Sequence, residues 1–128
     1  MIVDASALIA IVVREPDHAQ LRRKLARAQA PGMGTPTLTE TAMVLGGRLG
    51  IDPRPLLARL LQEFRITPVP FGDDHWREAA RAFVLYGKGR HAARLNFGDC
   101  MAYATARLAG QPLLCKGEDF ARTDIEVA

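Results

Sequence analysis

The chain has 128 residues and a mass of 14.0 kDa, of which 48% are hydrophobic and 24% charged. This composition predicts one globular domain, residues 1–128, which can bury about two thirds of its unfolded surface without a disulfide or metal. Seventeen Lys and Arg against 14 Asp and Glu give a net charge of +3, which permits a nucleic-acid partner without identifying one. The sequence has no apolar run of ~20 residues and no secretory signal pattern, so we expect a cytoplasmic protein without a membrane partner.

The first half of the chain alternates apolar runs with amphipathic segments. Met1-Ile2-Val3 stops at Asp4, and the apolar residues 7–13 that follow Ser6 predict a buried strand that turns sharply into a helix. The next predicted elements are a helix after Pro16, a short strand at 33–36, a helix at 37–49 and a helix that opens at Asp52 and Pro53.

The second half continues this alternation. The predicted elements begin with an edge strand at 66–71 interrupted by two prolines, a helix at 73–86 and a glycine-rich basic loop at 87–91. They continue with a helix that opens at Gly98-Asp99, a strand at 112–115, a short turn at 119–120 and a last strand at 125–127. Strands separated by helices favour an α/β domain with a parallel sheet.

Four acidic residues lie where this arrangement predicts the ends of strands or the first turns of helices: Asp4, Glu40, Asp99 and Asp119. In an open parallel sheet, the carboxyl ends of the strands and the amino ends of the helices meet at one edge, where ligands bind. Clustered carboxylates repel one another, and Mg²⁺ or Mn²⁺ relieves that repulsion because both ions prefer oxygen ligands. Such an ion can activate water against a phosphate.

Each acid also has a purely structural interpretation. Asp4 could cap the following helix, Thr37-x-x-Glu40 matches a capping box, and Asp99 and Asp119 could complement helix dipoles. Capping does not require the four residues to converge, whereas a metal site does. Composition and spacing alone leave the two interpretations open.

Four segments resemble the PIN-domain family, specifically the VapC toxins of bacterial VapBC toxin–antitoxin pairs. They are Met1-Ile2-Val3-Asp4-Ala5-Ser6-Ala7-Leu8, Pro36-Thr37-Leu38-Thr39-Glu40, Leu95-Asn96-Phe97-Gly98-Asp99-Cys100-Met101-Ala102-Tyr103-Ala104 and Leu113-Leu114-Cys115-Lys116-Gly117-Glu118-Asp119-Phe120. The resemblance implies a flavodoxin-like three-layer α/β/α sandwich with a parallel central sheet. It also implies an endoribonuclease dependent on Mg²⁺ or Mn²⁺, which acts on RNA, forms a homodimer and is blocked by a cognate VapB-type antitoxin.

The resemblance also assigns roles to single residues. Asp4 and Asp99 are implied as metal ligands, and Glu40 as a ligand or a water-orienting base. Ser6 matches a small hydroxyl residue that bonds within the site, although a plain helix N-cap would explain it equally well. Asp119 is implied as the fourth acid. Many family members carry an acid or Asn where Gly117 stands, so either Glu118 or Asp119 could fill that place, and we favour Asp119.

RNA also requires cations at the mouth of an acidic pocket. Lys88, Arg90, His91 and Arg94 precede the Asp99 helix and Lys116 follows Cys115, so we expect these residues to steer the phosphate backbone. Charged loops are also commonly only solvated surface.

Two other functions remain open from the residues alone. An aspartyl-phosphate protein is disfavoured because Ser6 stands where such a phosphatase has its second Asp, and Ile2-Val3 where a receiver has an acid pair. A non-catalytic RNA-binding module would use the basic surface without the acids.

Overall fold

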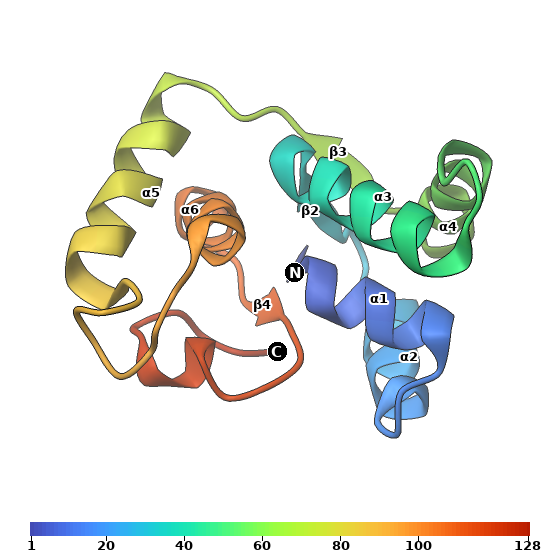
Figure 1. Ribbon diagram of the computed structural model, residues 1–128, viewed down its shortest axis with the longest axis horizontal. Helices are drawn as coiled ribbons and strands as arrows, with labels where there is room; N and C mark the ends of the chain where they lie inside the picture. The colour runs from blue at the N-terminus through green and yellow to red at the C-terminus, as the bar shows by residue number, and fades with distance from the viewer.

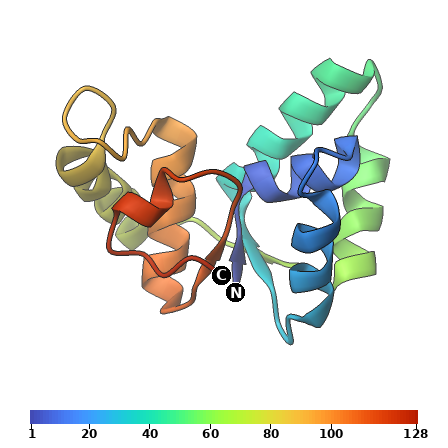
Figure 2. The same cartoon turned by 90° about the horizontal axis from the view of Figure 1, so that it is seen from below.

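A four-stranded parallel sheet lies between two helical layers in the computed structural model, which describes residues 1–128 (Figures 1 and 2). The strands are β1 (Ile2–Val3), β2 (Gly32–Gly34), β3 (Thr67–Val69) and β4 (Leu113–Leu114), in the order β3-β2-β1-β4. The helices are α1 (Ala5–Val13), α2 (His18–Arg27), α3 (Thr35–Leu49), α4 (Arg54–Phe64), α5 (Asp73–Tyr86), α6 (Phe97–Ala109) and the 3₁₀ turn η1 (Phe120–Arg122). The predicted three-layer α/β/α sandwich is confirmed.

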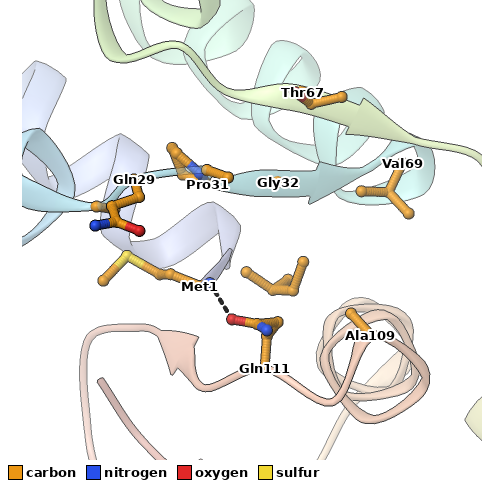
Figure 3. Close-up of a pocket in the computed structure, with 11 residues that line it drawn as sticks. Met1, Gln29, Pro31, Gly32, Thr67, Val69, Ala109 and Gln111 are labelled. Atoms are coloured by element: carbon orange, nitrogen blue, oxygen red, sulfur yellow. Dashed lines mark hydrogen bonds between the residues drawn. The ribbon is translucent and has the colours of Figure 1, made fainter.

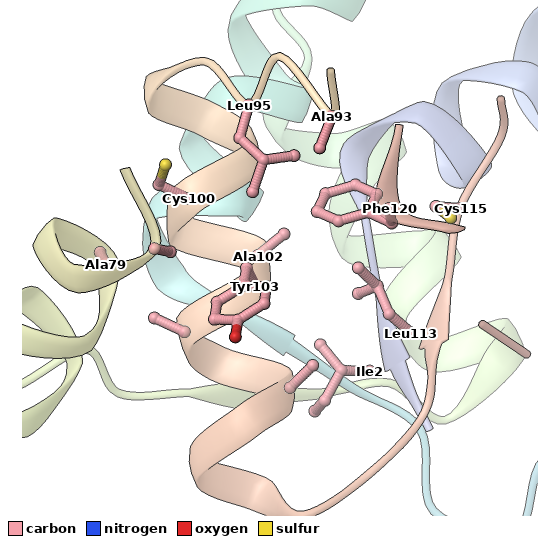
Figure 4. Packing of buried hydrophobic residues seen from close by; sticks show 13 residues of the cluster. Ile2, Ala79, Ala93, Leu95, Cys100, Ala102, Tyr103, Leu113, Cys115 and Phe120 are labelled. Atoms are coloured by element: carbon pink, nitrogen blue, oxygen red, sulfur yellow. The ribbon is translucent and has the colours of Figure 1, made fainter. Parts of the chain in front are cut away.

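The two residues of β1 divide the core between the layers. Ile2 packs with residues of α5 and α6, and its neighbour Val3 packs with residues of α1, α2 and α4. This follows from the alternation of side chains along a strand. Figure 4 shows the first of these clusters, where Ile2 and Leu113 face Tyr103 of α6. Burial of both faces explains why β1 and β4 are continuously apolar rather than alternating.

Helix α6 packs unusually close to the sheet. A Cβ atom added at Gly34 would lie 2.6 Å from Thr105 Oγ1 of α6, a distance that real Cβ atoms do not adopt. The absence of a side chain at Gly34 therefore sets how near α6 comes to β2. The first turn of α6 is thereby brought to the carboxyl edge of the sheet, where the site is built.

Helix α3 begins earlier than the sequence predicted. The expected strand at 33–36 is instead Gly32–Gly34, and the helix starts at Thr35 with Pro36 in its first turn. Proline favours this position because its fixed φ suits a helix start and its missing N–H is not needed there. Glu40 is therefore the sixth residue of α3 and not in the first turn. The alternative interpretation of Thr37 and Glu40 as a capping box is wrong, since Thr37 is buried inside the helix and its hydroxyl has no partner.

The C-terminal segment does not form the predicted last strand at 125–127. It pairs with the sheet only through an isolated parallel bridge between Leu113 and Val127. Just before it, Asp124 accepts hydrogen bonds from Tyr103 Oη at 2.6 Å and from Arg107 Nη1 at 2.6 Å. These bonds hold the segment against α6, so only its end reaches β4. None of the helices combines the length and the apolar content required to cross a membrane.

Candidate active site

Asp4 stands where β1 ends and α1 begins. Its carboxylate caps α1 by accepting a hydrogen bond from the Ser6 backbone N–H at 3.1 Å, so the structural interpretation of Asp4 is correct. The side chain is only 4% exposed. Burying a carboxylate costs free energy unless it is compensated. A helix cap would be served equally well by an exposed side chain, so capping alone does not account for the burial.

Ser6 connects the ends of two neighbouring strands. Its hydroxyl donates to Asp4 Oδ2 at 2.5 Å and accepts the backbone N–H of Lys116, which follows β4, at 3.0 Å. The chain continues from β1 to β2 on one side of β1, while β4 lies on the other side, and ligands bind at such a reversal of strand order. The alternative that Ser6 is a plain N-cap is wrong, because Asp4 is the N-cap of α1.

Glu40 and Asp99 approach the same edge from α3 and α6. Asp99 lies in the first turn of α6, where Asn96 Oδ1 accepts its backbone N–H at 2.9 Å and its own Oδ2 accepts the Asn96 N–H at 3.0 Å. Asp99 is thus both a capping residue and a member of the acidic group. Glu40 lies directly against Gly98, whose missing Cβ leaves room for the Glu40 carboxylate.

Burial raises the pKa values of Asp4, Glu40 and Asp99, and the charges of neighbouring acids add to the shifts of Glu40 and Asp99. Burial raises the pKa of Asp99 to about 6, opposed by the Asn96 N–H and increased by the charges of Asp4 and Asp119. Burial, followed by the charges of Asp4 and Asp99, also raises the pKa of Glu40. The pKa of Asp4 is raised by burial, which outweighs the hydrogen bonds from Ser6. The four predicted acids therefore belong to one electrostatic group.

Asp119 and Glu118 act on different partners. The charge of Asp119 contributes to the raised pKa of Asp99, whereas the charge of Glu118 contributes to the raised pKa of the Cys115 thiol. Both side chains are exposed, in the loop between β4 and η1. This difference supports Asp119 as the fourth acid. Cys100 and Cys115 are free and buried.

The donor set suits a hard divalent cation. The candidate ligand atoms are all carboxylate oxygens. Both hydrogen bonds from Ser6 go to Asp4 Oδ2, so Asp4 Oδ1 makes no hydrogen bond with Ser6. No three of the acidic, histidine or cysteine side chains are close enough together to hold one ion directly. A hard divalent cation that is held by one or two carboxylates and keeps several waters would fit this spacing, whereas a cation caged entirely by protein ligands would not.

The basic residues expected to contact RNA differ in their surroundings. Lys88, Arg90 and Arg94 are exposed on the loop between α5 and α6, which is closed by backbone bonds from Lys88 to Leu95 and from Leu95 to Tyr86, both 2.9 Å. The fourth predicted cation, Lys116, is not free. Its ammonium group pairs with Glu15 and lies 3.7 Å from Asp17 Oδ1.

An apolar groove of about 310 Å³ adjoins the acids and was not predicted. Two of its most prominent side chains, Met43 of α3 and Phe97 of α6, are 72% and 79% exposed, and Glu40 forms part of its wall. A second hollow of about 660 Å³ lies at the opposite edge of the sheet, beside Met1 and Gln111 (Figure 3). No acidic residue lines that hollow, which separates it from the site.

Comparison with known proteins agrees with this geometry. The PIN domain family model matches residues 1–126. The chain is 49% identical over 127 residues to Ribonuclease VapC36 of Mycobacterium tuberculosis, covering 98% of this chain and 91% of the relative. It is 42% identical to Ribonuclease VapC of Mycolicibacterium smegmatis, covering 98% and 97%.

Solved structures show the same fold. The crystal structure of Mycobacterium tuberculosis VapC20, described as a sarcin-ricin loop cleaving toxin, superposes with a TM-score of 0.80 at 21% identity over 99% of this chain and 97% of that chain. A toxin–antitoxin complex from Klebsiella pneumoniae gives 0.72 at 19% identity, covering 99% and 95%. The chain belongs to the PIN-domain family and, within it, to the VapC ribonucleases.

Proposed function

We propose that this protein is the toxin of a type II toxin–antitoxin pair and cuts RNA internally, using Mg²⁺ or Mn²⁺ held among Asp4, Asp99 and Glu40, by one or two of these carboxylates directly and by the rest through water. The observation that carries the proposal is the group of mutually repelling, partly buried carboxylates at the reversal point of a PIN-domain sheet. When bound there, the ion supplies charge for the phosphate and a more acidic water.

The protein's own groups prepare this chemistry. Ser6 fixes the orientation of Asp4 through two hydrogen bonds to Oδ2, and the Asn96 cap fixes Asp99. The raised pKa of Glu40 suits a group that orients a water and accepts its proton, because general bases work best when their pKa approaches the working pH. Asp119 adds negative charge next to Asp99 and thereby strengthens cation binding.

The loop between α5 and α6 is the proposed contact for the RNA backbone. Lys88, Arg90 and Arg94 are exposed there, immediately before the helix that carries Asp99. Arg122 of η1 donates to the Ala92 carbonyl at 3.1 Å and so connects this loop to the segment that carries Asp119. Contacts of this kind bind phosphate regardless of base sequence, and we infer no base preference from them.

A second copy of the chain is the proposed occupant of the apolar groove. The exposed outer face of α3 contains few charged side chains, and Met43 and Phe97 project from the two sides of the groove. A face without excess charge can meet a copy of itself without repulsion, whereas RNA would require cations there. The homodimer would place two acidic sites close together.

The remaining expectations rest on the relatives. Because a toxin–antitoxin complex is among the similar structures, we propose a VapB-type antitoxin that blocks the acidic site. The cytoplasmic location stays a prediction. The aspartyl-phosphate and purely RNA-binding alternatives gain no support from the family match.

The test is cleavage of a long single-stranded RNA with Mg²⁺ or Mn²⁺, with EDTA, and with the Asp4→Asn variant. We expect products with either ion and none in the other two conditions. Full cleavage in EDTA by freshly dialysed protein would refute the proposal.

A further inference from the structure

Lys116 makes two contacts at once, one with its backbone and one with its side chain. Its N–H donates to Ser6 Oγ at 3.0 Å, while its ammonium group pairs with Glu15 and lies near Asp17. Glu15 and Asp17 belong to the turn between α1 and α2, about 100 residues away in sequence. The side chain therefore fastens the loop after β4 to the far end of the helix that Asp4 caps.

The backbone contact decides where the Ser6 proton points. A serine hydroxyl has one proton to donate and lone pairs to accept. Since the Lys116 N–H occupies the acceptor side of Ser6 Oγ, the proton is directed to Asp4 Oδ2, 2.5 Å away. Without that N–H, the hydroxyl could rotate and accept or donate elsewhere. The position of residue 116 thus affects the orientation of the Asp4 carboxylate.

The ion pair is itself supported. Glu15 is bonded through its own N–H to the Ala10 carbonyl at 3.0 Å, and its second carboxylate oxygen lies 3.8 Å from Arg48 Nη1 of α3. Three elements, α1, α3 and the loop after β4, therefore meet at Glu15. A loop residue held by such a junction keeps its backbone in one place.

We propose that Lys116 is a positioning residue that acts through Ser6 on Asp4, and that its ion pair with Glu15 is what holds it. This inference rests on the proposed ribonuclease function, because Asp4 is assigned there as a metal ligand. It replaces the expectation that Lys116 steers RNA.

The two roles of Lys116 predict opposite effects of Glu15→Gln. If Lys116 steers phosphate, the variant leaves only Asp17 beside the ammonium group and removes a negative charge, so RNA affinity rises. If Lys116 positions Ser6, the variant loosens the loop after β4, so kcat falls by about tenfold while KM for RNA stays unchanged, because small misplacements of reacting groups are costly. Lys116→Met should behave like Glu15→Gln, and Lys116→Arg should keep most of the activity.

The experiment pairs these rates with amide hydrogen exchange measured by NMR. The matched control is Glu63→Gln, which breaks the distant ion pair between Glu63 and Arg22. In Glu15→Gln and Lys116→Met, we expect exchange of the residue-116 amide to accelerate by about tenfold, as local opening does when a restraint is lost. The control should leave both this exchange and kcat unchanged.

Two results would overturn the proposal. One is unchanged exchange at residue 116 in Glu15→Gln, and the other is a lower KM with an unchanged kcat in the same variant. The exchange measurement needs neither metal nor RNA. If the wild type cleaves no RNA at all, the proposed function fails, while the exchange data still decide whether the ion pair holds residue 116.

Discussion

Glu40 and Gly98 are in direct contact where α3 meets the first turn of α6. A Cβ atom at position 98 would overlap the Glu40 carboxylate, so the glycine is what permits an acid from one helix to lie against the amino end of another. The helix amino end partly offsets the cost of holding Glu40 beside Asp4 and Asp99.

Gly98→Ala should therefore lower cleavage while leaving the protein folded. Alanine favours a helix over glycine by about 0.5–1 kcal/mol, so the backbone gains stability, but Glu40 has to move away. We expect a loss of tenfold or more in kcat, roughly, with little change in Tm. Gly72→Ala is the matched control, because a Cβ there meets nothing within 4 Å. Equal activity of the two variants would show that the position of Glu40 is unimportant.

Asp99→Asn should separate catalysis from folding. Asparagine can still accept the Asn96 N–H and keep the cap of α6. It removes one of the charges that we propose bind the cation. A loss of about 3 kcal/mol of transition-state stabilisation corresponds to roughly a 100-fold slower reaction. Thermal unfolding without divalent ions should show a Tm equal to or above that of the wild type, since repulsion is relieved. A large fall in Tm would mean that Asp99 is chiefly structural.

The raised pKa values predict how stability depends on pH. Asp99 titrates near 3.8 when unfolded and at about 6 when folded, so the folded state holds its proton more tightly. That contribution is complete below pH 4 and is lost as pH rises through 6. Allowing for partial exposure, it amounts to roughly 1–2 kcal/mol.

The check is urea unfolding of metal-free protein between pH 4 and 7. The contribution of Asp99 is the difference between the wild type and Asp99→Asn, which should show a flatter dependence. Mn²⁺ should restore stability at pH 7 more than at pH 5, because it binds the ionised acids. Identical pH profiles for the two proteins would contradict the assignment.

The sequence was sufficient for the element order and for most helix and strand positions. The β-branched start, the apolar spacing of α4 and the Asp-rich start of α5 are local signals, and local signals predicted those elements correctly. Pro36 misled the prediction because it was assigned to the end of a strand rather than to the first turn of a helix. The predicted last strand at 125–127 was wrong because Asp124 bonds to α6, a contact between residues distant in sequence.

The convergence of the four acids could be predicted from sequence because strand ends and helix amino ends meet at one edge of a parallel sheet. The hydrogen-bond partners that orient these acids could not be predicted from the sequence. Ser6 was expected to bond within the site, but its link to the Lys116 N–H depends on which strand neighbours β1. Similarly, the pairing of Lys116 with Glu15 requires the loop after β4 to lie beside α1, and nothing in the residues near Lys116 indicates that.

Arg90→Ala tests the proposed RNA contact. Arg90 is exposed and lies over the Phe83 ring at 5.4 Å, so its removal leaves no buried charge unpaired. We expect a higher KM, an unchanged kcat, and a salt dependence of RNA binding that is weaker by about one phosphate contact. Arg59→Ala, on the exposed face of α4 in the other helical layer, is the control. Indistinguishable salt slopes for both variants would exclude Arg90 from the RNA path.

Met43→Glu tests the proposed dimer face. Met43 is 72% exposed on α3, so a glutamate there costs little folding free energy in the monomer. In a symmetric dimer it would bring two like charges together, so we expect sedimentation to show a monomer where the wild type is a dimer. Met43→Leu should remain dimeric. A wild type that is monomeric at micromolar concentration would refute the interface.

Binding of a divalent cation among Asp4, Glu40 and Asp99 is tested most directly by isothermal titration of Mn²⁺ into the wild type and Asp4→Asn near pH 7. We predict saturable uptake by the wild type that the substitution weakens at least about tenfold. Equal uptake by both proteins, or none by the wild type at millimolar Mn²⁺, would contradict it.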